Sequence, residues 1–146
     1  MEFIAKTFDE LSTVELYEIA RARTEIFLLE QRIVCRDLDG VDYKSLHCFF
    51  YEGDKVVAYL RAFKNDEREN EAVIGRVLST THGIGLGKAL MEKSIPEIKK
   101  HFSPKRITLH SQKHANGFYE KLGFSVCSDE FLEEGVVHVE MELVLD

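Results

Sequence analysis

The sequence predicts a single α/β domain, spanning residues 1–146, that is built on a mixed sheet. The chain has 146 residues, close to the commonest size of one domain, and contains no repeat, low-complexity tract or linker. Hydrophobic residues make up 45% of the sequence and charged residues 31%, as in a globular protein that folds around a core. Hairpin signals are mixed with strand–helix–strand patterns along the chain, and that mixture is typical of an α/β sandwich.

The chain begins with a strand and a well-marked helix. Residues 2–8 are expected to form the first strand. Ser12-Thr13-Val14-Glu15 has the S-x-x-E pattern of a capping box, which starts a helix. Apolar residues at helical spacing extend this helix to about Leu28. Residues 30–44 are polar and rich in aspartate, so we expect a long loop there, and loops of that length in a compact domain are often functional.

Three strands are expected next. Residues 46–51 and 55–64 are rich in aromatic and β-branched residues. The intervening Glu52-Gly53-Asp54 is a turn signal, so the two segments are expected to form a hairpin. A further strand is expected at residues 72–79, and a glycine-rich loop follows it.

A helix from about Gly85 to His101 is expected after the glycine-rich loop. Pro96 lies inside it and is expected to kink the helix or to start a new turn. One apolar face nevertheless continues along the helix through Met91, Ile95, Ile98 and Phe102. The remaining expected elements are a strand at 105–110, a short helix at about 113–122, and two final strands at 124–127 and 136–145.

Composition excludes several classes of protein. The net charge of −7 argues against non-specific binding to nucleic acid or to anionic membranes, which requires a basic face. Cys35, Cys48 and Cys127 form no C-x-x-C pair, so neither a disulfide framework nor a zinc knuckle is expected. The first residues carry an early acid and no long apolar stretch, unlike a signal peptide, and no apolar run approaches the length of a membrane span. We therefore expect a cytoplasmic protein.

The strongest local signal is the glycine-rich loop itself. It reads His82-Gly83-Ile84-Gly85-Leu86-Gly87-Lys88 and lies between a predicted strand and a predicted helix. Glycines let backbone N–H groups approach a ligand closely and adopt positive φ angles. The N-terminus of the following helix adds unpaired N–H donors and a partial positive charge. The loop is therefore suited to a pyrophosphate, with a tight turn that binds no ligand as the alternative.

Two common phosphate-binding patterns do not fit this loop. A P-loop requires G-x-x-x-x-G-K-[ST], but Gly87-Lys88 is followed by Ala89, and His82 stands at the position of the first glycine. The Rossmann pattern G-x-G-x-x-G fails from both Gly83 and Gly85. A compact βαβ unit with a ribose-binding acid downstream is also missing from the sequence.

A third family matches in two places. Gly85-Leu86-Gly87 fits the G-x-G of the pyrophosphate loop [QR]-x-x-G-x-[GA] of the GNAT superfamily. Further along the chain, Phe118-Tyr119-Glu120-Lys121-Leu122-Gly123-Phe124 resembles the junction between a helix and a strand in the same superfamily. Because both motifs occur in the family's order, the chain is identified as a member of the GNAT superfamily of N-acetyltransferases. It resembles the ElaA-like subgroup in residues 27–31, 37–42 and 133–138, and in His47 and Met141.

The resemblance implies both a fold and a cosubstrate. It implies a mixed, mostly antiparallel sheet of six to seven strands, flanked by about four helices, in which the central strands at 72–79 and 105–110 are splayed. Acetyl-CoA would place its pantetheine arm in the gap, along the backbone of Val77 and Ser79. Its diphosphate would bind the backbone amides of the loop. The cofactor-binding residues implied are Val77, Leu78, Ser79, His82, Gly83, Ile84, Gly85, Leu86, Gly87, Lys88, Gln112 and Tyr119.

The resemblance also implies direct attack of a primary amine on the thioester. Tyr119 occupies the family's position for the general acid that protonates the leaving thiolate. A backbone N–H near Val77 or Leu78 would polarise the carbonyl oxygen. The general base is left open among Glu30, His47, Asp39 and His138, and each of these could instead be a structural polar residue. A non-catalytic acyl-CoA-binding or regulatory module of the same fold is the alternative function.

Other residues carry weaker expectations. His82 stands where the family has Arg or Gln, and Lys88 could compensate as a point charge. Arg61 and Arg76, on predicted strands, either bind an anionic substrate group or pair with the aspartate-rich loop. The pattern of His110 and neighbouring residues matches no zinc motif, so no metal is expected. The expected partner is a small-molecule or peptide amine, rather than nucleic acid or a membrane, and homodimers are common in the superfamily.

Overall fold

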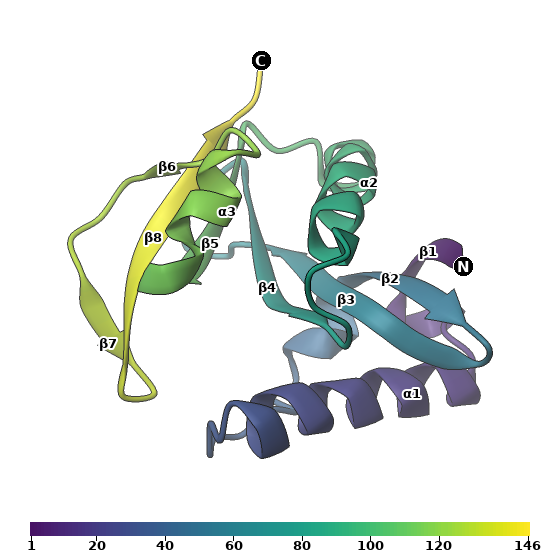
Figure 1. The fold of residues 1–146 in the computed structure, drawn as a ribbon. Coiled ribbons are helices and arrows are strands. Elements are labelled where there is room, and N and C mark those ends of the chain that lie inside the picture. The colour runs from purple at the N-terminus through teal and green to yellow at the C-terminus, as the bar shows by residue number, and fades with distance from the viewer.

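The fold was examined in a computed structural model that describes all 146 residues. Eight strands form one sheet in the order β1-β2-β3-β4-β5-β8-β6, and β7 pairs with β8 beside this path (Figure 1). All pairings are antiparallel except that of β4 with β5. The strands are β1 (Glu2–Thr7), β2 (Leu46–Glu52), β3 (Lys55–Lys64), β4 (Glu71–Ser79), β5 (Arg106–Gln112), β6 (Ser125–Val126), β7 (Phe131–Glu133) and β8 (Val136–Val144).

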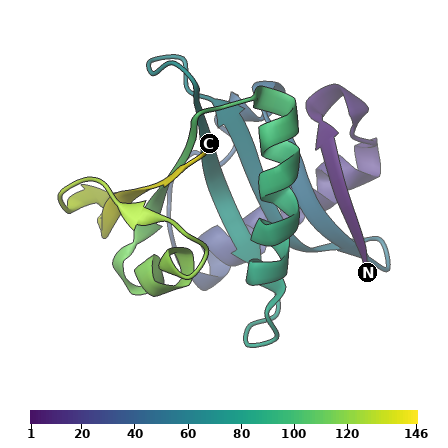
Figure 2. The same ribbon diagram turned by 90° about the horizontal axis from the view of Figure 1, so that it is seen from above.

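Helices cover both faces of the sheet. They are α1 (Thr13–Arg23), α2 (Leu86–Phe102) and α3 (Asn116–Glu120). Seen from above, α2 lies across one face of β2, β3 and β4, α1 lies behind the sheet on the other face, and α3 lies near β5 (Figure 2). None of the helices combines the length and the apolar character needed to cross a membrane. The predicted mixed, mostly antiparallel α/β fold is confirmed, with eight strands in place of six to seven and three α-helices in place of four.

The capping box starts α1 as predicted. The backbone N–H of Glu15 donates to Ser12 Oγ at 3.0 Å, and the N–H of Ser12 donates to Glu15 Oε1 at 2.8 Å. The helical path does not stop at Arg23, because a π-helical turn continues it through Thr24–Glu30. A π-turn inserts an extra residue per turn and is frequent at functional sites. It carries the helix two residues beyond the predicted end at Leu28.

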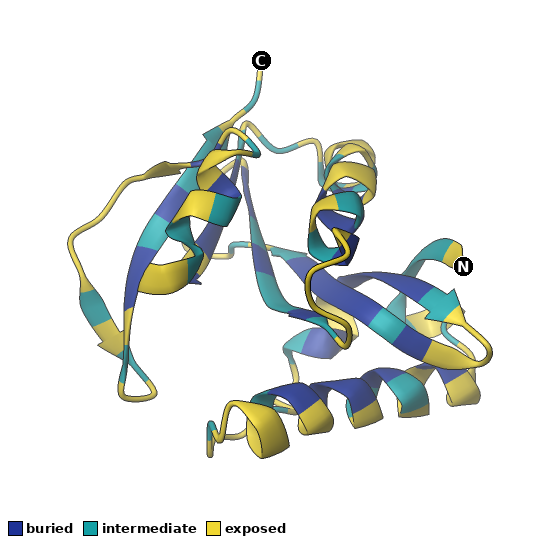
Figure 3. Ribbon diagram, in the orientation of Figure 1, coloured by how far each residue is buried: buried dark blue, intermediate teal, exposed yellow.

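Two hydrophobic cores lie on opposite faces of the sheet. Cys48 and Leu60 point into the larger core under α2, whereas Phe49 and Tyr59, one residue away on the same strands, point into the smaller core under α1. This alternation follows from the two-residue repeat of a β-strand. Figure 3 shows the buried residues of α1 on the side that faces the sheet, while the loop between β4 and α2 is exposed. The central strands are therefore fixed from both sides.

Helix α2 continues unbroken through Pro96. Met91 and Ile98 on its apolar face are fully buried, and Ile95 and Phe102 pack against the same core. The burial of this face compensates for the N–H group that proline lacks. Pro96 therefore does not end the helix or start a new one.

The central parallel pair of strands separates along its length. Pairing of β4 with β5 runs from Glu71↔Arg106 to Ile74↔Leu109 and then ends. Just beyond this point Arg76 adopts a positive φ of 56°, and the register of β4 against β3 shifts. Such a bulge bends a strand away from its neighbour. Figure 1 shows the resulting opening between the half of the sheet that ends in β4 and the half that begins with β5, so the predicted splay is confirmed.

One strand was missed by the sequence analysis. No strand was expected between residues 127 and 136, but Phe131–Glu133 forms β7 and pairs with Val136–His138 of β8. Glu134 and Gly135, with φ angles of 50° and 75°, make the tight turn of this hairpin. Two consecutive positive φ angles are typical of a type I′ turn, whose twist suits a short hairpin.

Candidate active site

A cavity of about 510 Å³ lies where β4 and β5 separate. One wall is formed by Val77 of β4, another by Tyr119 of α3, and a third by His138 of β8. The segment between residues 31 and 39 and the β7–β8 hairpin complete the wall. A smaller cavity of about 320 Å³, beside Lys64 and Phe102 at the other end of β4, contains neither sequence motif. The larger cavity is therefore the candidate active site.

The glycine-rich loop presents a row of free backbone donors. Gly83 and Gly85 adopt positive φ angles of 81° and 77°, which only glycine takes up without strain. The first backbone bond of α2 runs from the N–H of Ala89 to the oxygen of Gly85, at 3.0 Å. None of the N–H groups from His82 to Lys88 donates to another backbone group of the chain. A row of unpaired amides at a helix N-terminus fits a bound phosphate group.

The strand before this loop offers a second kind of contact. Beyond Ile74, β4 has no partner on the side of β5, so its backbone forms an exposed sheet edge there. Val77 lines the cavity, whereas Leu78 packs into the smaller core and Ser79 Oγ donates to the carbonyl of Thr81 at 2.8 Å. An unpaired edge can bind an extended chain by strand addition. Only backbone groups of Leu78 and Ser79 are thus candidates for ligand contacts.

Tyr119 lies at the inner wall of the cavity. Its side chain is 8% exposed and packs against Phe118 and Phe124, with ring centroids 5.0 and 6.0 Å away. Burial raises the pKa of Tyr119 to about 12, and it is the single cause of that shift. The hydroxyl is therefore protonated at neutral pH and is not held by another charge or side chain. A group of this kind can donate a proton into the cavity.

Glu30 is placed differently from the sequence hypothesis. It ends the π-helical turn and accepts a hydrogen bond from His82 Nε2 at 3.1 Å, with its side chain half exposed. It is not among the residues that line the cavity. The next residue, Gln31, does line it and accepts a hydrogen bond from Gln112 Nε2 at 3.4 Å. Glu30 thus contacts the glycine-rich loop, and this geometry gives no support to its role as general base.

His47 is also removed from the list of candidate bases. It is 1% exposed, lies outside the cavity wall, and burial lowers the pKa of its ring. Its Nε2–H donates to the carbonyl of Asp42 at 2.9 Å, and its Nδ1 accepts from the Tyr59 hydroxyl at 2.7 Å. Both ring nitrogens are therefore occupied in the neutral form. This geometry favours the structural alternative for His47 and gives no support to its role as general base.

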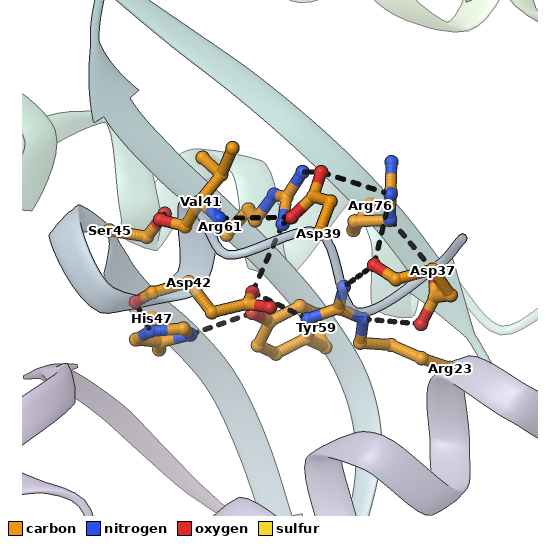
Figure 4. Close-up of polar contacts among 10 residues, drawn as sticks. All are labelled: Arg23, Asp37, Asp39, Val41, Asp42, Ser45, His47, Tyr59, Arg61 and Arg76. Carbon is orange, nitrogen blue, oxygen red and sulfur yellow. Dashed lines mark hydrogen bonds and ion pairs between the residues drawn. The ribbon is translucent and has the colours of Figure 1, made fainter.

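The aspartate-rich loop is fixed by three arginines (Figure 4). Arg23, only 1% exposed, donates to Asp42 Oδ1 at 2.6 Å and to Asp37 Oδ2 at 3.0 Å. Arg61 donates one hydrogen bond to each carboxylate oxygen of Asp39, both at 2.8 Å. The remaining ion pairs join Arg76 to Asp37 at 2.8 Å, Arg76 to Asp39 at 3.4 Å and Arg61 to Asp42 at 3.1 Å. Arg61 and Arg76 therefore pair with this loop, the second of the two roles that the sequence allowed.

Asp39 and His138 are the two candidate bases that line the cavity. The hydrogen bonds from Arg61 hold the pKa of Asp39 far below its usual range, so this carboxylate is a poor proton acceptor at neutral pH. Of the four candidate bases, His138 is therefore the one that both lines the cavity and is not paired with an arginine. Sequence analysis missed Glu133 and His110, which line the same cavity and contact each other at 2.8 Å.

Lys88 does not reach the cavity. Its side chain is 69% exposed, and its nearest acidic partner is Glu92, 3.8 Å away on the next turn of α2. The ammonium group is therefore free to bind an anion at the start of the helix. His82, at the start of the loop, has a side chain that is 70% exposed and contacts Glu30.

Comparison with known proteins agrees with this architecture. The model of an acetyltransferase (GNAT) domain family matches residues 29–145. A UPF0039 protein from Schizosaccharomyces pombe is 37% identical over 99% of this chain and 98% of its own length. Protein ElaA from Escherichia coli is 32% identical over 90% of this chain and 89% of its own.

Solved structures give the same result. An acyl-CoA N-acyltransferase from Pseudomonas aeruginosa superimposes with a TM-score of 0.91 at 29% identity, covering 99% of this chain and 100% of that one. The crystal structure of Escherichia coli ElaA superimposes with a TM-score of 0.90 at 31% identity, covering 97% and 98% of the two chains. The family model covers most of the chain, and Tyr119 of the second sequence motif lines the cavity. The chain therefore belongs to the GNAT acetyltransferase domain family.

Proposed function

We propose that this protein is a cytoplasmic enzyme that transfers an acetyl group from acetyl-CoA to a primary amine. One observation carries the proposal: the unpaired edge of β4 and the Tyr119 hydroxyl bound the same cavity, and the row of free amides at the start of α2 follows directly after β4. The first feature suits an extended pantetheine arm and the last suits a diphosphate. Family membership supports the assignment of an acyltransferase.

The chain offers a specific set of contacts to acetyl-CoA. The amides of Gly83 to Lys88 would hold the diphosphate, because they have no other backbone partner. The backbone of Val77 would pair with the pantetheine arm along the open edge of β4. Gln112, at the end of β5, faces the cavity from the other side of the opening. The bound cosubstrate supplies an activated thioester.

Tyr119 has the properties required of a general acid. It keeps its proton at neutral pH because burial raises its pKa to about 12. The leaving thiolate can accept a hydrogen bond from this hydroxyl, and the proton passes to the sulfur as the carbon–sulfur bond breaks. A backbone N–H near Val77 or Leu78 would stabilise the negative charge on the carbonyl oxygen during attack. The amine attacks directly, and this proposal needs no acyl-enzyme.

A second candidate is a non-catalytic acyl-CoA-binding module. It is favoured by the contact between Glu30 and His82, which places a carboxylate beside the donors meant for a diphosphate. Negative charge there opposes the binding of a polyanion. Both functions require acetyl-CoA to bind, and they differ in whether the bound thioester is consumed.

Two measurements test the proposal in sequence. Calorimetry with acetyl-CoA is expected to give one site per chain, and acetyl-CoA is expected to raise the Tm. A coenzyme A release assay is then run against amino sugars, polyamines, amino acids and peptide N-termini, and at least one amine is expected to be acetylated. Absence of both heat and thermal protection would contradict acetyl-CoA binding. Binding without turnover of any amine would favour the non-catalytic module.

A further inference from the structure

A cluster of three titratable side chains faces the cavity from the half of the sheet that contains β5, β7 and β8. Glu133 of β7 lies between two imidazoles: its Oε1 is 2.8 Å from Nδ1 of His110, and its Oε2 is 3.6 Å from Nε2 of His138. All three residues line the cavity that also contains Tyr119. The steps proposed above for Tyr119 and for the backbone of β4 involve none of these three side chains.

The tautomer of His138 follows from its contacts. Nδ1 lies 2.8 Å from the carbonyl oxygen of Val136, and a carbonyl can only accept, so Nδ1 carries the hydrogen. In the neutral ring Nε2 therefore holds the lone pair. The distance of 3.6 Å from Nε2 to Glu133 is too long for a direct hydrogen bond, so this nitrogen is free to accept a proton.

The ring of His138 is held in place by stacking and by burial. It stacks on Phe131 across the β7–β8 pair, with ring centroids 6.1 Å apart and planes inclined by 21°. The backbone of His138 is fixed by pairing with Gln112 of β5. The side chain is 9% exposed. A base whose orientation is fixed by packing loses little entropy when it meets its substrate.

Glu133 is a carboxylate at neutral pH. The hydrogen bond from His110 lowers the pKa of Glu133, and the same bond raises the pKa of His110. The charge of Arg76 on β4 also lowers the pKa of Glu133. The pKa of His110 is raised by the charge of Glu140 and lowered by that of Arg68. A carboxylate in the wall can accept a hydrogen bond from the N–H of a neutral amine. It also lies where positive charge would appear on the ring of His138.

We propose that His138 is the general base of the reaction and that Glu133, fixed by His110, binds the nitrogen of the acceptor amine beside it. This inference rests on the proposed acetyltransferase function and assigns the proton acceptor within it. As the amine nitrogen forms its bond to the carbonyl carbon, His138 Nε2 takes a proton from that nitrogen. Tyr119 gives its own proton to the sulfur as the carbon–sulfur bond breaks. His138 then releases its proton to solvent and Tyr119 regains one, so the cycle is balanced.

The test compares three variants with the best amine of the panel. His138→Gln keeps a donor for Val136 and removes the base, so kcat/KM is expected to fall by about 10² to 10⁴. Glu133→Gln is expected to raise KM for the amine more than it lowers kcat. Asp129→Asn, an exposed change just before β7, is the control and should leave both constants unchanged.

A measurement without turnover separates this inference from the proposed function. Two-bond ¹H–¹⁵N correlation spectra of the free protein are expected to show His138 protonated on Nδ1. Protonation on Nε2 instead, or a His138→Gln variant with wild-type kcat/KM and pH profile, overturns the assignment of His138 and leaves the acetyltransferase proposal standing. Failure of the wild-type protein to acetylate any amine overturns the proposed function, and this inference falls with it.

Discussion

Gly87, in the first turn of α2, lies against the ring of Phe118 on α3: a Cβ atom built on Gly87 would be 3.3 Å from Cζ of that ring. This contact joins the two motifs that identified the family. Because Gly87 has no side chain, the start of α2 can lie close to Phe118 of α3. Because Phe118 precedes Tyr119, the spacing of the two helices also sets the position of the hydroxyl.

Replacing Gly87 with alanine tests this contact. The new Cβ would push Phe118 by a few tenths of an ångström and shift Tyr119 with it, so kcat is expected to fall several-fold. Alanine is otherwise a better helix former than glycine by about 1 kcal/mol, which offsets part of any loss of stability. Gly117→Ala is the matched control, because nothing lies within 4 Å of its added Cβ. Equal activity of the two variants would contradict the coupling.

His47→Gln separates a structural histidine from a catalytic one. The variant is expected to lose about 1–3 kcal/mol of unfolding free energy, because Tyr59 and Asp42 lose a buried partner. Catalysis by the folded protein should be unchanged. A large fall in kcat without loss of stability would restore His47 as a candidate base.

The same variant has a predicted pH dependence. Burial lowers the pKa of His47 in the folded protein below the value of about 6.5 that an unfolded histidine has. Below that pH the unfolded chain gains a proton that the folded chain does not bind, so the wild-type unfolding free energy falls as pH falls. His47→Gln should show a shallower fall between about pH 7 and 5 in urea titrations. An identical slope in both proteins would argue against a buried neutral ring.

Glu30→Gln should strengthen the binding of acetyl-CoA. The change removes a negative charge that engages His82 beside the free amides. Because both side chains are exposed, the expected gain is only about twofold to fivefold in Kd, and it should shrink at high salt. Glu25→Gln removes a charge from the same π-helical turn without that contact and serves as the control. Weaker binding in Glu30→Gln would mean that Glu30 assists the cosubstrate.

Arg23→Met should be strongly destabilising. It leaves Asp42 and Asp37 without the buried guanidinium that binds both, and breaking such a pair costs about 3–5 kcal/mol. Arg21→Met, two residues earlier, removes an exposed partner of Glu18 and should cost no more than about 0.5 kcal/mol. Urea unfolding of both variants measures the difference. Similar midpoints would show that the aspartate-rich loop is not anchored through Arg23.

The parts of the fold that were predicted from sequence depend on local signals. Ser12 and Glu15 mark the start of α1, and both cap bonds are present. Gly53 and Asp54 form the β2–β3 turn with φ angles of 55° and 60°. The glycine-rich loop lies at the start of α2 as expected. Each of these features is set by residues a few positions apart, so a linear sequence contains the needed information.

The parts that were missed depend on contacts between distant residues. Glu133 meets His110 only because β7 pairs with β8, and β8 with β5. A strand of three residues leaves too short a pattern to detect. His47 and Glu30 were reasonable candidate bases as isolated residues, but burial in one case and a contact with His82 in the other place them elsewhere. Which of these residues line the cavity is decided by how the strands pack, and a linear sequence does not show that.

Tyr119→Phe removes the hydroxyl that is proposed to give its proton to the leaving thiolate. The measurement is kcat for the best amine, together with Kd for acetyl-CoA from calorimetry. We expect kcat to fall by about 10² to 10⁴ while Kd stays within twofold, because only the hydroxyl is removed. Tyr17→Phe, at an exposed position that is 65% accessible, should match the wild type. A Tyr119→Phe variant with wild-type kcat would contradict the account.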